Sequence, residues 1–214
     1  MVKKLILIWV VGISCCWTNT VWSKTTILVL GDSLSASYGL QQEQGWVALL
    51  NNRFNAQHLP YQLINASISG ETTAGGLSRL ESILTKQSYT YILIELGAND
   101  GLRGFSPLLM KNNLLQIIQR AKQHQVQPLL MDIQIPPNYG PRYTQLFHQV
   151  FKQLATQEAI PLLPFFMTFI ATKPNLIQAD GLHPNLQAQA YIVDIMEKEL
   201  LKVLTIQEKN NAHH

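Results

Sequence analysis

The chain has 214 residues, of which 47% are hydrophobic, and its 16 basic and 13 acidic residues give a formal net charge of +3. This length and apolar content suit one domain with a substantial core, and they exclude a disordered chain. Nucleic-acid binding normally requires a concentrated basic stripe, and the sequence has none. The composition therefore favours a globular protein that acts on something other than nucleic acid.

Residues 1–23 have the pattern of a secretory signal peptide. A short basic head is followed by an almost wholly apolar run at 5–17, which is too short to cross about 30 Å of hydrocarbon. Val21 and Ser23 occupy the two positions that a signal peptidase reads. We expect cleavage after Ser23 and a periplasmic or secreted protein without a membrane span. A retained N-terminal anchor is the alternative.

Both cysteines of the chain, Cys15 and Cys16, fall in this segment. A mature chain that starts at Lys24 would therefore contain none and would need no disulfide in an oxidising compartment. Lys3 and Lys4 are lost with the signal, so the formal charge falls from +3 to +1.

After residue 24, short apolar runs alternate with segments of helical periodicity, which predicts strands alternating with helices. The predicted strands are 25–30, 61–68, 91–96, 128–135 and 160–166. The predicted helices are 46–54, 72–85, 109–124, 143–158 and 188–204. We expect an α/β fold with a five-stranded parallel sheet covered by helices on both faces, as one domain over 24–204. A polar tail is expected to fray at 205–214.

Two finer expectations concern the later elements. The prolines of the fifth strand, Pro161 and Pro164, favour an edge position in the sheet, because proline cannot donate to the ladder. The predicted buried stripe of the helix at 143–158 consists of Leu146, Val150, Phe151 and Leu154.

The first predicted strand ends abruptly at Gly31, Asp32 and Ser33. Glycine allows the backbone a sharp exit, and open α/β sheets bind their ligands at the carboxyl ends of the strands. Ser33 is therefore a candidate nucleophile. The alternative is an ordinary turn or helix N-cap serine.

A second constellation lies near the end of the chain, where Asp180 precedes His183 by three residues in a loop with Gly181 and Pro184. This spacing lets the carboxylate accept from one imidazole nitrogen while the other nitrogen faces Ser33. Acyl transfer through serine needs such a base and such a carboxylate. We predict a catalytic triad of Ser33, His183 and Asp180.

Acyl transfer also needs donors for the developing oxyanion. We predict the backbone amides of Ser33 and Gly70 and the side-chain amide of Asn99. Gly70 precedes a predicted helix start, where amides are unpaired. A turn glycine and an Asx-turn are the alternatives for Gly70 and Asn99. We interpret Asp32 and Glu95 as structural acids that hydrogen-bond the loops of the site.

The stretches around Ser33, Gly70, Asn99 and His183 resemble the four blocks of the SGNH, or GDSL, hydrolase family. The strings at 99–104, 137–140 and 162–166 are similar to those of its bacterial periplasmic thioesterase, protease, lysophospholipase and arylesterase group, and the resemblance covers about residues 25–201. It implies a flavodoxin-like three-layer α/β/α sandwich that hydrolyses esters and thioesters through an acyl-serine intermediate. Ser33 would be the nucleophile, His183 the base and then the acid, and Asp180 its support.

We expect an apolar groove for an acyl chain beside Ser33. Its predicted lining residues lie in loops that flank the serine, and ordinary loop packing is their alternative role. These residues are Leu102, Phe105, Pro136, Pro137 and Tyr139. The sequence has neither a His-Glu-x-x-His motif nor paired cysteines with metal-ligand spacing, so we expect no metal and no other cofactor.

The expected partners are small-molecule acyl esters or thioesters, with lipid-derived ones favoured, and the chain is expected to act as a monomer. A carbohydrate or xenobiotic acyl esterase is the alternative enzyme, and it would need polar loops around the serine. A periplasmic lipid-binding protein without catalysis is the alternative from another class. The presence of every group that the chemistry needs favours an enzyme.

Overall fold

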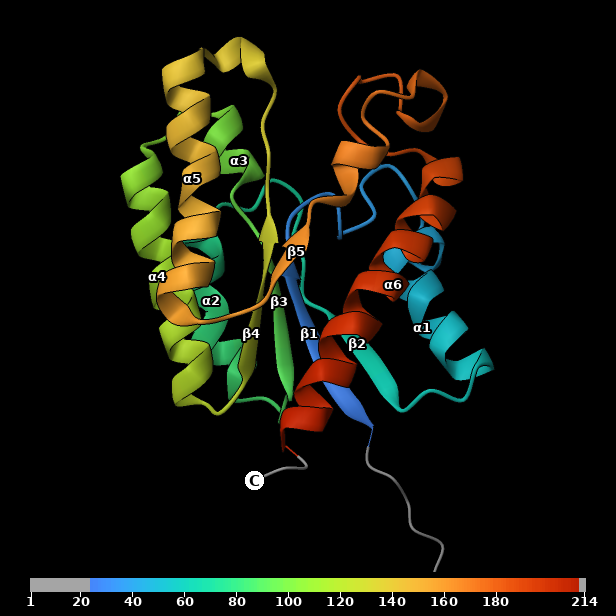
Figure 1. The fold of residues 1–214 in the computed structure, drawn as a ribbon. Coiled ribbons are helices and arrows are strands. Elements are labelled where there is room, and N and C mark those ends of the chain that lie inside the picture. Colours follow the sequence, from blue (N-terminus) through green and yellow to red (C-terminus); the bar gives the residue numbers. More distant parts are fainter. Residues whose placement is uncertain (1–23, 212–214) are drawn as a thin grey trace, which may run out of the picture.

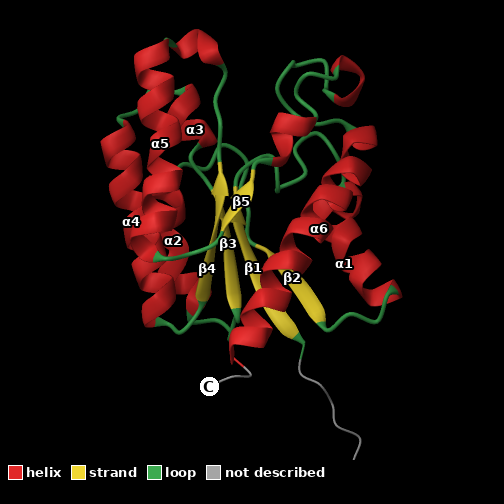
Figure 2. Cartoon of the chain, in the orientation of Figure 1, coloured by secondary structure: helices red, strands yellow, loops and turns green. Residues whose placement is uncertain are grey.

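The computed structural model describes residues 24–211, and it shows a single parallel sheet between two layers of helices (Figures 1 and 2). The predicted signal peptide at 1–23, with both cysteines, lies outside the described residues. Within 24–211, none of the helices combines the length and the hydropathy that crossing a bilayer requires.

The sheet has five strands in the order β2-β1-β3-β4-β5, and every pair of neighbours is parallel. The strands are β1 (Thr25–Gly31), β2 (Tyr61–Asn65), β3 (Tyr91–Glu95), β4 (Gln127–Asp132) and β5 (Leu162–Pro164). β5 lies at an edge, as its prolines predicted. The strand order reverses between β1 and β3, and that reversal is where open α/β sheets form their ligand crevice.

Helices cover both faces of this sheet, which confirms the predicted three-layer α/β/α fold. The helices are α1 (Trp46–Ala56), α2 (Thr73–Leu84), α3 (Ala98–Leu102), α4 (Pro107–Gln123), α5 (Pro141–Glu158) and α6 (Leu186–Asn211). On one face α1 packs against α6, and on the other α4 packs between α2 and α5 (Figure 1). The short helix α3 was not predicted, because five residues are too few to show a helical period.

The last helix is longer than predicted. We expected it to end near residue 204, but α6 continues to Asn211. Residues 205–211 contain neither glycine nor proline, and Gln207, Glu208 and Lys209 are good helix formers. The polar composition of 205–211 suggested a fraying tail, but it is compatible with a continued helix.

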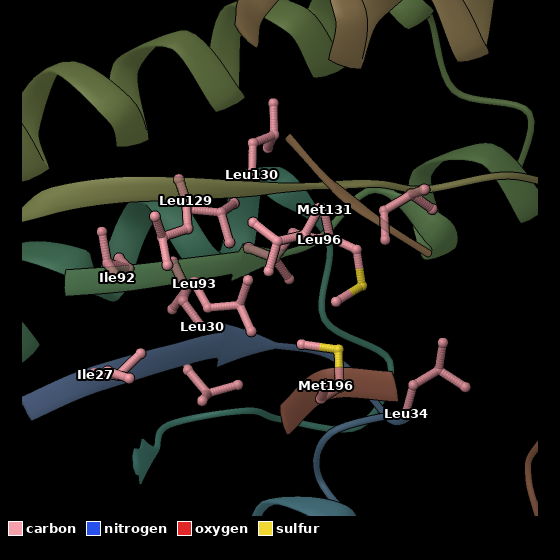
Figure 3. Packing of buried hydrophobic residues seen from close by; sticks show 14 of the residues in the cluster. Ile27, Leu30, Leu34, Ile92, Leu93, Leu96, Leu129, Leu130, Met131 and Met196 are labelled. Carbon is pink, nitrogen blue, oxygen red and sulfur yellow. The ribbon is translucent and has the colours of Figure 1, made fainter. Parts of the chain in front are cut away.

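The central strands are buried along their length, which explains their unbroken apolar runs. Residues Ile27 and Leu30 of β1 and Ile92 and Leu93 of β3 are fully buried. Figure 3 shows these side chains packed together with those of β4 and with Met196 of α6. Because helices cover both faces, the alternation of polar and apolar residues that marks a half-exposed sheet is absent here.

The buried face of α5 differs from the prediction by one residue. Leu146 is 49% exposed, whereas its neighbour Phe147 is fully buried and lies 5.5 Å, centroid to centroid, from the ring of Phe151. Adjacent residues on a helix point about 100° apart, so only one of the two can face the core. The expected burial of Val150, Phe151 and Leu154 is confirmed.

Replacing Phe147 with Ala should destabilise the fold by about 3–5 kcal/mol, because it empties a fully buried aromatic site. The matched change Leu146→Ala should stay within about 0.5 kcal/mol, since that side chain is half exposed. Urea unfolding of both variants measures the difference. A larger loss for Leu146→Ala than for Phe147→Ala would contradict the helix orientation.

Candidate active site

The carboxyl ends of the strands and the loops that follow them gather at one edge of the sheet (Figure 1). β1 leaves the sheet at Gly31, where an added Cβ would lie 2.5 Å from Oε2 of Glu95 and 2.9 Å from Oγ of Ser67. Only glycine fits so close to these oxygens. The chain then turns through Asp32 and presents Ser33, which is partly buried, at the edge of the sheet.

Ser33, His183 and Asp180 form a continuous hydrogen-bonded chain. Ser33 Oγ lies 2.9 Å from Nε2 of His183, and Nδ1 of the same ring lies 2.7 Å from Oδ2 of Asp180. An ionised carboxylate can only accept, so the ring proton resides on Nδ1 and Nε2 is free to accept from the serine hydroxyl. The structure thus brings together all three residues of the predicted triad.

Asp180 is held in its ionised form by local hydrogen bonds. The backbone N–H groups of His183 and Leu182 both donate to its Oδ1, at 3.0 and 2.9 Å, while Oδ2 accepts from the imidazole. These bonds lower the pKa of Asp180 to about 2. The carboxylate is therefore charged at neutral pH.

Two further residues hold His183 in place, and neither was predicted. The ring of Tyr38 lies over the imidazole, with 4.2 Å between ring centroids. Gln178 donates from its backbone N–H to the carbonyl of His183 and from Nε2 to the carbonyls of Tyr38 and Pro184. This glutamine therefore links the loop of the base to the loop of the nucleophile.

Gly70 lies in a tight turn at 68–71. The turn is closed by the Glu71 N–H, which donates to the Ile68 carbonyl at 3.1 Å, and Gly70 has φ of +78°. A type II turn requires positive φ at its third position, which explains the glycine. Gly70 is therefore a turn glycine that also lines the same cavity as Ser33, and its role as an oxyanion donor stays a prediction.

Asn99, in the first turn of α3, is oriented by a buried acid. Its Nδ2 donates to Oδ2 of Asp32 at 3.1 Å, while Oδ1 of Asp32 accepts from the N–H of Leu34. One of the two N–H bonds of the Asn99 amide is occupied in this way, and the other remains available to a ligand in the cavity that Asn99 lines.

Asp32 is supported in turn by Glu95 at the end of β3. Oε2 of Glu95 accepts from the Asp32 N–H at 3.3 Å and from the Ser35 hydroxyl at 2.8 Å. Burial raises the pKa of Asp32 to about 6, and burial together with the nearby Asp32 raises the pKa of Glu95 well above its usual range. Both acids hold the loops of the site, as we interpreted them from the sequence.

A cavity of about 660 Å³ opens beside Ser33, His183, Gly70 and Asn99. Its volume is within the range of small-molecule sites, and most of its wall is apolar. The apolar part includes Leu102, Ile135, Pro136, Pro137, Phe165 and Met167. Among the side chains described at 24–206, no group of three or more His, Cys, Asp or Glu is placed to hold a metal ion.

Three of the five predicted lining residues, Leu102, Pro136 and Pro137, do line this cavity, and two do not. Phe105 is 44% exposed outside it. Tyr139 does not line the cavity, but its hydroxyl donates a hydrogen bond to the carbonyl of the lining residue Leu102 at 3.0 Å. Loop sequence shows that a residue is apolar, but it does not show which way the side chain points.

The far wall of the cavity comes from the loop between β5 and α6 and was not predicted from the sequence. This wall includes Phe165, Met167, Thr168 and Ile177. A connection of about twenty residues is long for an α/β domain, and such loops commonly serve binding. That length was the signal available in the sequence.

Serine hydrolases have a serine hydroxyl that is hydrogen-bonded to a histidine, whose other ring nitrogen is hydrogen-bonded to a carboxylate, with amide donors near the serine. The site described above has this arrangement of serine, histidine and carboxylate. The chain belongs to the GDSL-like Lipase/Acylhydrolase family, whose model matches residues 29–191. This confirms the resemblance seen in the sequence.

Individual relatives agree with this assignment. The chain is 46% identical to Thioesterase 1/protease 1/lysophospholipase L1 of Escherichia coli K12 over 175 residues, which is 82% of this chain and 83% of that protein. It is also 46% identical to Esterase TesA of Pseudomonas aeruginosa over 169 residues, covering 79% and 84% of the two chains. The crystal structure of psychrotrophic esterase EstA from Pseudoalteromonas sp. matches with a TM-score of 0.84 at 49% identity, over 85% of this chain and 100% of that one.

Replacing Asp32 with Asn should make the stability of the protein less dependent on pH between 4 and 6. Asp32 titrates near pH 6 when folded and near its ordinary value of 3.8 when unfolded. The folded state therefore binds more protons across this window, and the stability of the wild type falls as the pH rises. Asp32 contributes at most about 1.4 kcal/mol per pH unit to this slope.

Urea unfolding at several pH values from 4 to 7 measures the slope. Glu95 acts in the same direction and remains in the variant, so the slope should be reduced but not abolished. The exposed change Glu43→Gln is the control for loss of one surface charge. An Asp32→Asn slope equal to that of the wild type would contradict the raised pKa.

Proposed function

We propose that this protein hydrolyses carboxylic esters and thioesters through an acyl intermediate on Ser33. The observation that carries the proposal is the hydrogen-bonded chain from Ser33 through His183 to Asp180 beside an apolar cavity. The names of the relatives, an esterase and a thioesterase/lysophospholipase, agree with it. The proposed groups all come from one chain, so the site is complete in a monomer.

In the proposed mechanism, His183 Nε2 removes the proton of Ser33 as Oγ attacks the acyl carbon. The carbonyl oxygen then becomes negatively charged. The N–H groups of Ser33 and Gly70 and the free N–H of the Asn99 amide are the proposed donors to it, and such donors are worth most when they are fixed in advance. The Asp32 bond to Asn99 supplies that fixation.

His183 next returns its proton to the leaving oxygen or sulfur as the bond to the acyl carbon breaks. Water then attacks the acyl-serine, with His183 again as the base, and releases the acid and free Ser33. Asp180 stays ionised throughout and stabilises the imidazolium, in agreement with its pKa of about 2.

We favour acyl chains derived from lipids as the natural substrates. The apolar wall of the cavity offers little to hydrogen-bond a sugar, which disfavours the carbohydrate acyl esterase. The proposal includes export by the signal at 1–23 to the periplasm or the exterior. Acyl-CoA is a cytoplasmic metabolite, so lysophospholipids and other fatty esters are the proposed substrates there, while thioester cleavage is an activity to be seen in vitro.

Replacing Ser33 with Ala should lower kcat by at least about 10⁴-fold, because the nucleophile is lost. The matched control is Ser69→Ala, which removes an exposed hydroxyl that also lines the cavity. Turnover of p-nitrophenyl esters, palmitoyl-CoA and lysophosphatidylcholine by the purified proteins measures both. If Ser33→Ala kept the turnover of the wild type, the acyl-serine mechanism would be wrong. If neither the wild type nor Ser33→Ala hydrolysed any substrate but both bound acyl chains, the protein would be a lipid-binding one.

The apolar wall gives a second expectation. Leu102→Ala should lower kcat/KM for p-nitrophenyl decanoate roughly tenfold, because it removes apolar contact with a long chain, and should change the value for the acetate by less than about twofold. The control is Phe105→Ala, a comparable truncation outside the cavity. Equal losses for decanoate and acetate, or a chain-length effect in the control alone, would place the acyl chain elsewhere.

A further inference from the structure

We propose that Arg103 is a positioning residue that fixes the distance between the two loops that carry the proposed oxyanion donors. The inference rests on the proposed function and deepens it. Gly70 belongs to the turn between β2 and α2, and Asn99 belongs to the short helix after β3. The chain between them is long, so their relative position depends on contacts across the gap.

Arg103 makes a contact with each side. Its backbone N–H donates to the carbonyl of Asn99 at 3.2 Å, at the end of α3, and its Nη2 donates to the carbonyl of Gly70 at 3.0 Å. One residue thus connects both residues that supply donors. A second tie lies deeper, where the backbone and hydroxyl of Thr73 donate to Asp100, but it holds the start of α2 and not the turn itself.

The turn at 68–71 is held to β1 by the Ile68 N–H, which donates to the Gly31 carbonyl at 3.1 Å, and to α2 by the ion pair of Glu71 with Arg79. Among residues 24–206, only the Arg103 side chain bonds this turn to the α3 side. Ile68 is 50% exposed and Ser69 is also exposed, so the turn has few packing contacts of its own. Glycine at its third position adds conformational freedom. Segments with few buried contacts open easily. A donor has to be held to within about 0.5 Å of its working position, which an untied turn would not achieve.

Arg103 acts from outside the cavity. Its side chain is exposed, it is absent from the cavity wall, and its Nη2 lies 3.6 Å from where a Cβ of Gly70 would be. It therefore contacts the turn without lining the cavity. A group in this place affects the transition state, where the donors are used, and leaves ground-state binding of the acyl chain unchanged.

The test compares Arg103→Met, which keeps the length of the side chain but cannot donate, with Arg103→Lys, which keeps a donor and the charge. Arg142→Met is the matched control, since Arg142 is an exposed cation at the start of α5 without a side-chain hydrogen bond or ion pair to the side chains described at 24–206. We expect kcat for a soluble p-nitrophenyl ester to fall about tenfold in Arg103→Met with KM within about twofold. The kcat of Arg103→Lys should stay within about threefold of the wild-type value, and the kcat of the Arg142→Met control should equal the wild-type value.

Two further readouts separate this role from a general loss of structure. The affinity for a trifluoromethyl ketone, whose adduct with Ser33 places an oxyanion among the donors, should fall by the same factor as kcat/KM, while inhibition by the product fatty acid should not change. Hydrogen exchange of the Glu71 amide, which closes the turn, should be faster in Arg103→Met alone. The exchange readout does not depend on the proposed function, which the Ser33→Ala variant tests separately.

The proposal is overturned if Arg103→Met keeps the wild-type kcat. It is also overturned if KM rises while kcat is unchanged, because the guanidinium would then contact substrate, or if Arg103→Lys is as impaired as Arg103→Met. If Arg103→Met lowers the thermal midpoint by more than a few degrees, the exchange of the Glu71 amide relative to amides of the buried strands decides. An equal increase everywhere would reject the positioning role.

Discussion

The site depends on a carboxyl group that never reaches the substrate. Glu95, fully buried at the end of β3, accepts from the backbone of Asp32 and from Ser35, and so fixes the loop that carries Ser33. Asp32, held in this way, can orient the amide of Asn99. The approach of β1 to this carboxyl is so close that only Gly31 can occupy the strand end. One buried acid therefore sets the positions of both the proposed nucleophile and a proposed oxyanion donor.

The buried acids that position the site reduce the stability of the folded protein. Burial raises the pKa values of Asp32, Glu95, Asp100 and Asp132, and all four lie at or just beyond the carboxyl ends of strands. Ionising such groups in the folded protein costs free energy that apolar residues would not cost. Asp32, Glu95 and Asp100 accept hydrogen bonds that fix the loops of the site and the start of α2, which is the usual conflict between an active site and the stability of its fold.

Much of this could be predicted from the sequence, because each group of the site follows a recognisable strand or lies in a turn marked by glycine and proline. Ser33 and Asn99 follow apolar runs, and Asp180 and His183 have a spacing that one turn brings together. Side-chain direction was harder to predict. Leu146 and Phe147 are adjacent and both apolar, but only Phe147 has the i, i+3, i+4, i+7 spacing with Val150, Phe151 and Leu154, so this error could have been avoided from the sequence. The expected positions of Phe105 and Tyr139 were wrong for another reason, since loops have no period that could show where a side chain points.

The order of Ser33 and His183 along the chain has a consequence for the protein during its synthesis. Ser33 and its base are 150 positions apart, and His183 lies just before the final helix. A chain that emerges N-terminus first displays the serine long before the histidine exists. On the proposed mechanism, the growing or still unfolded polypeptide is therefore inert toward the lipids of the cell that makes it. On this mechanism, the protein becomes active only when the loop that carries His183 has folded into place beside Ser33.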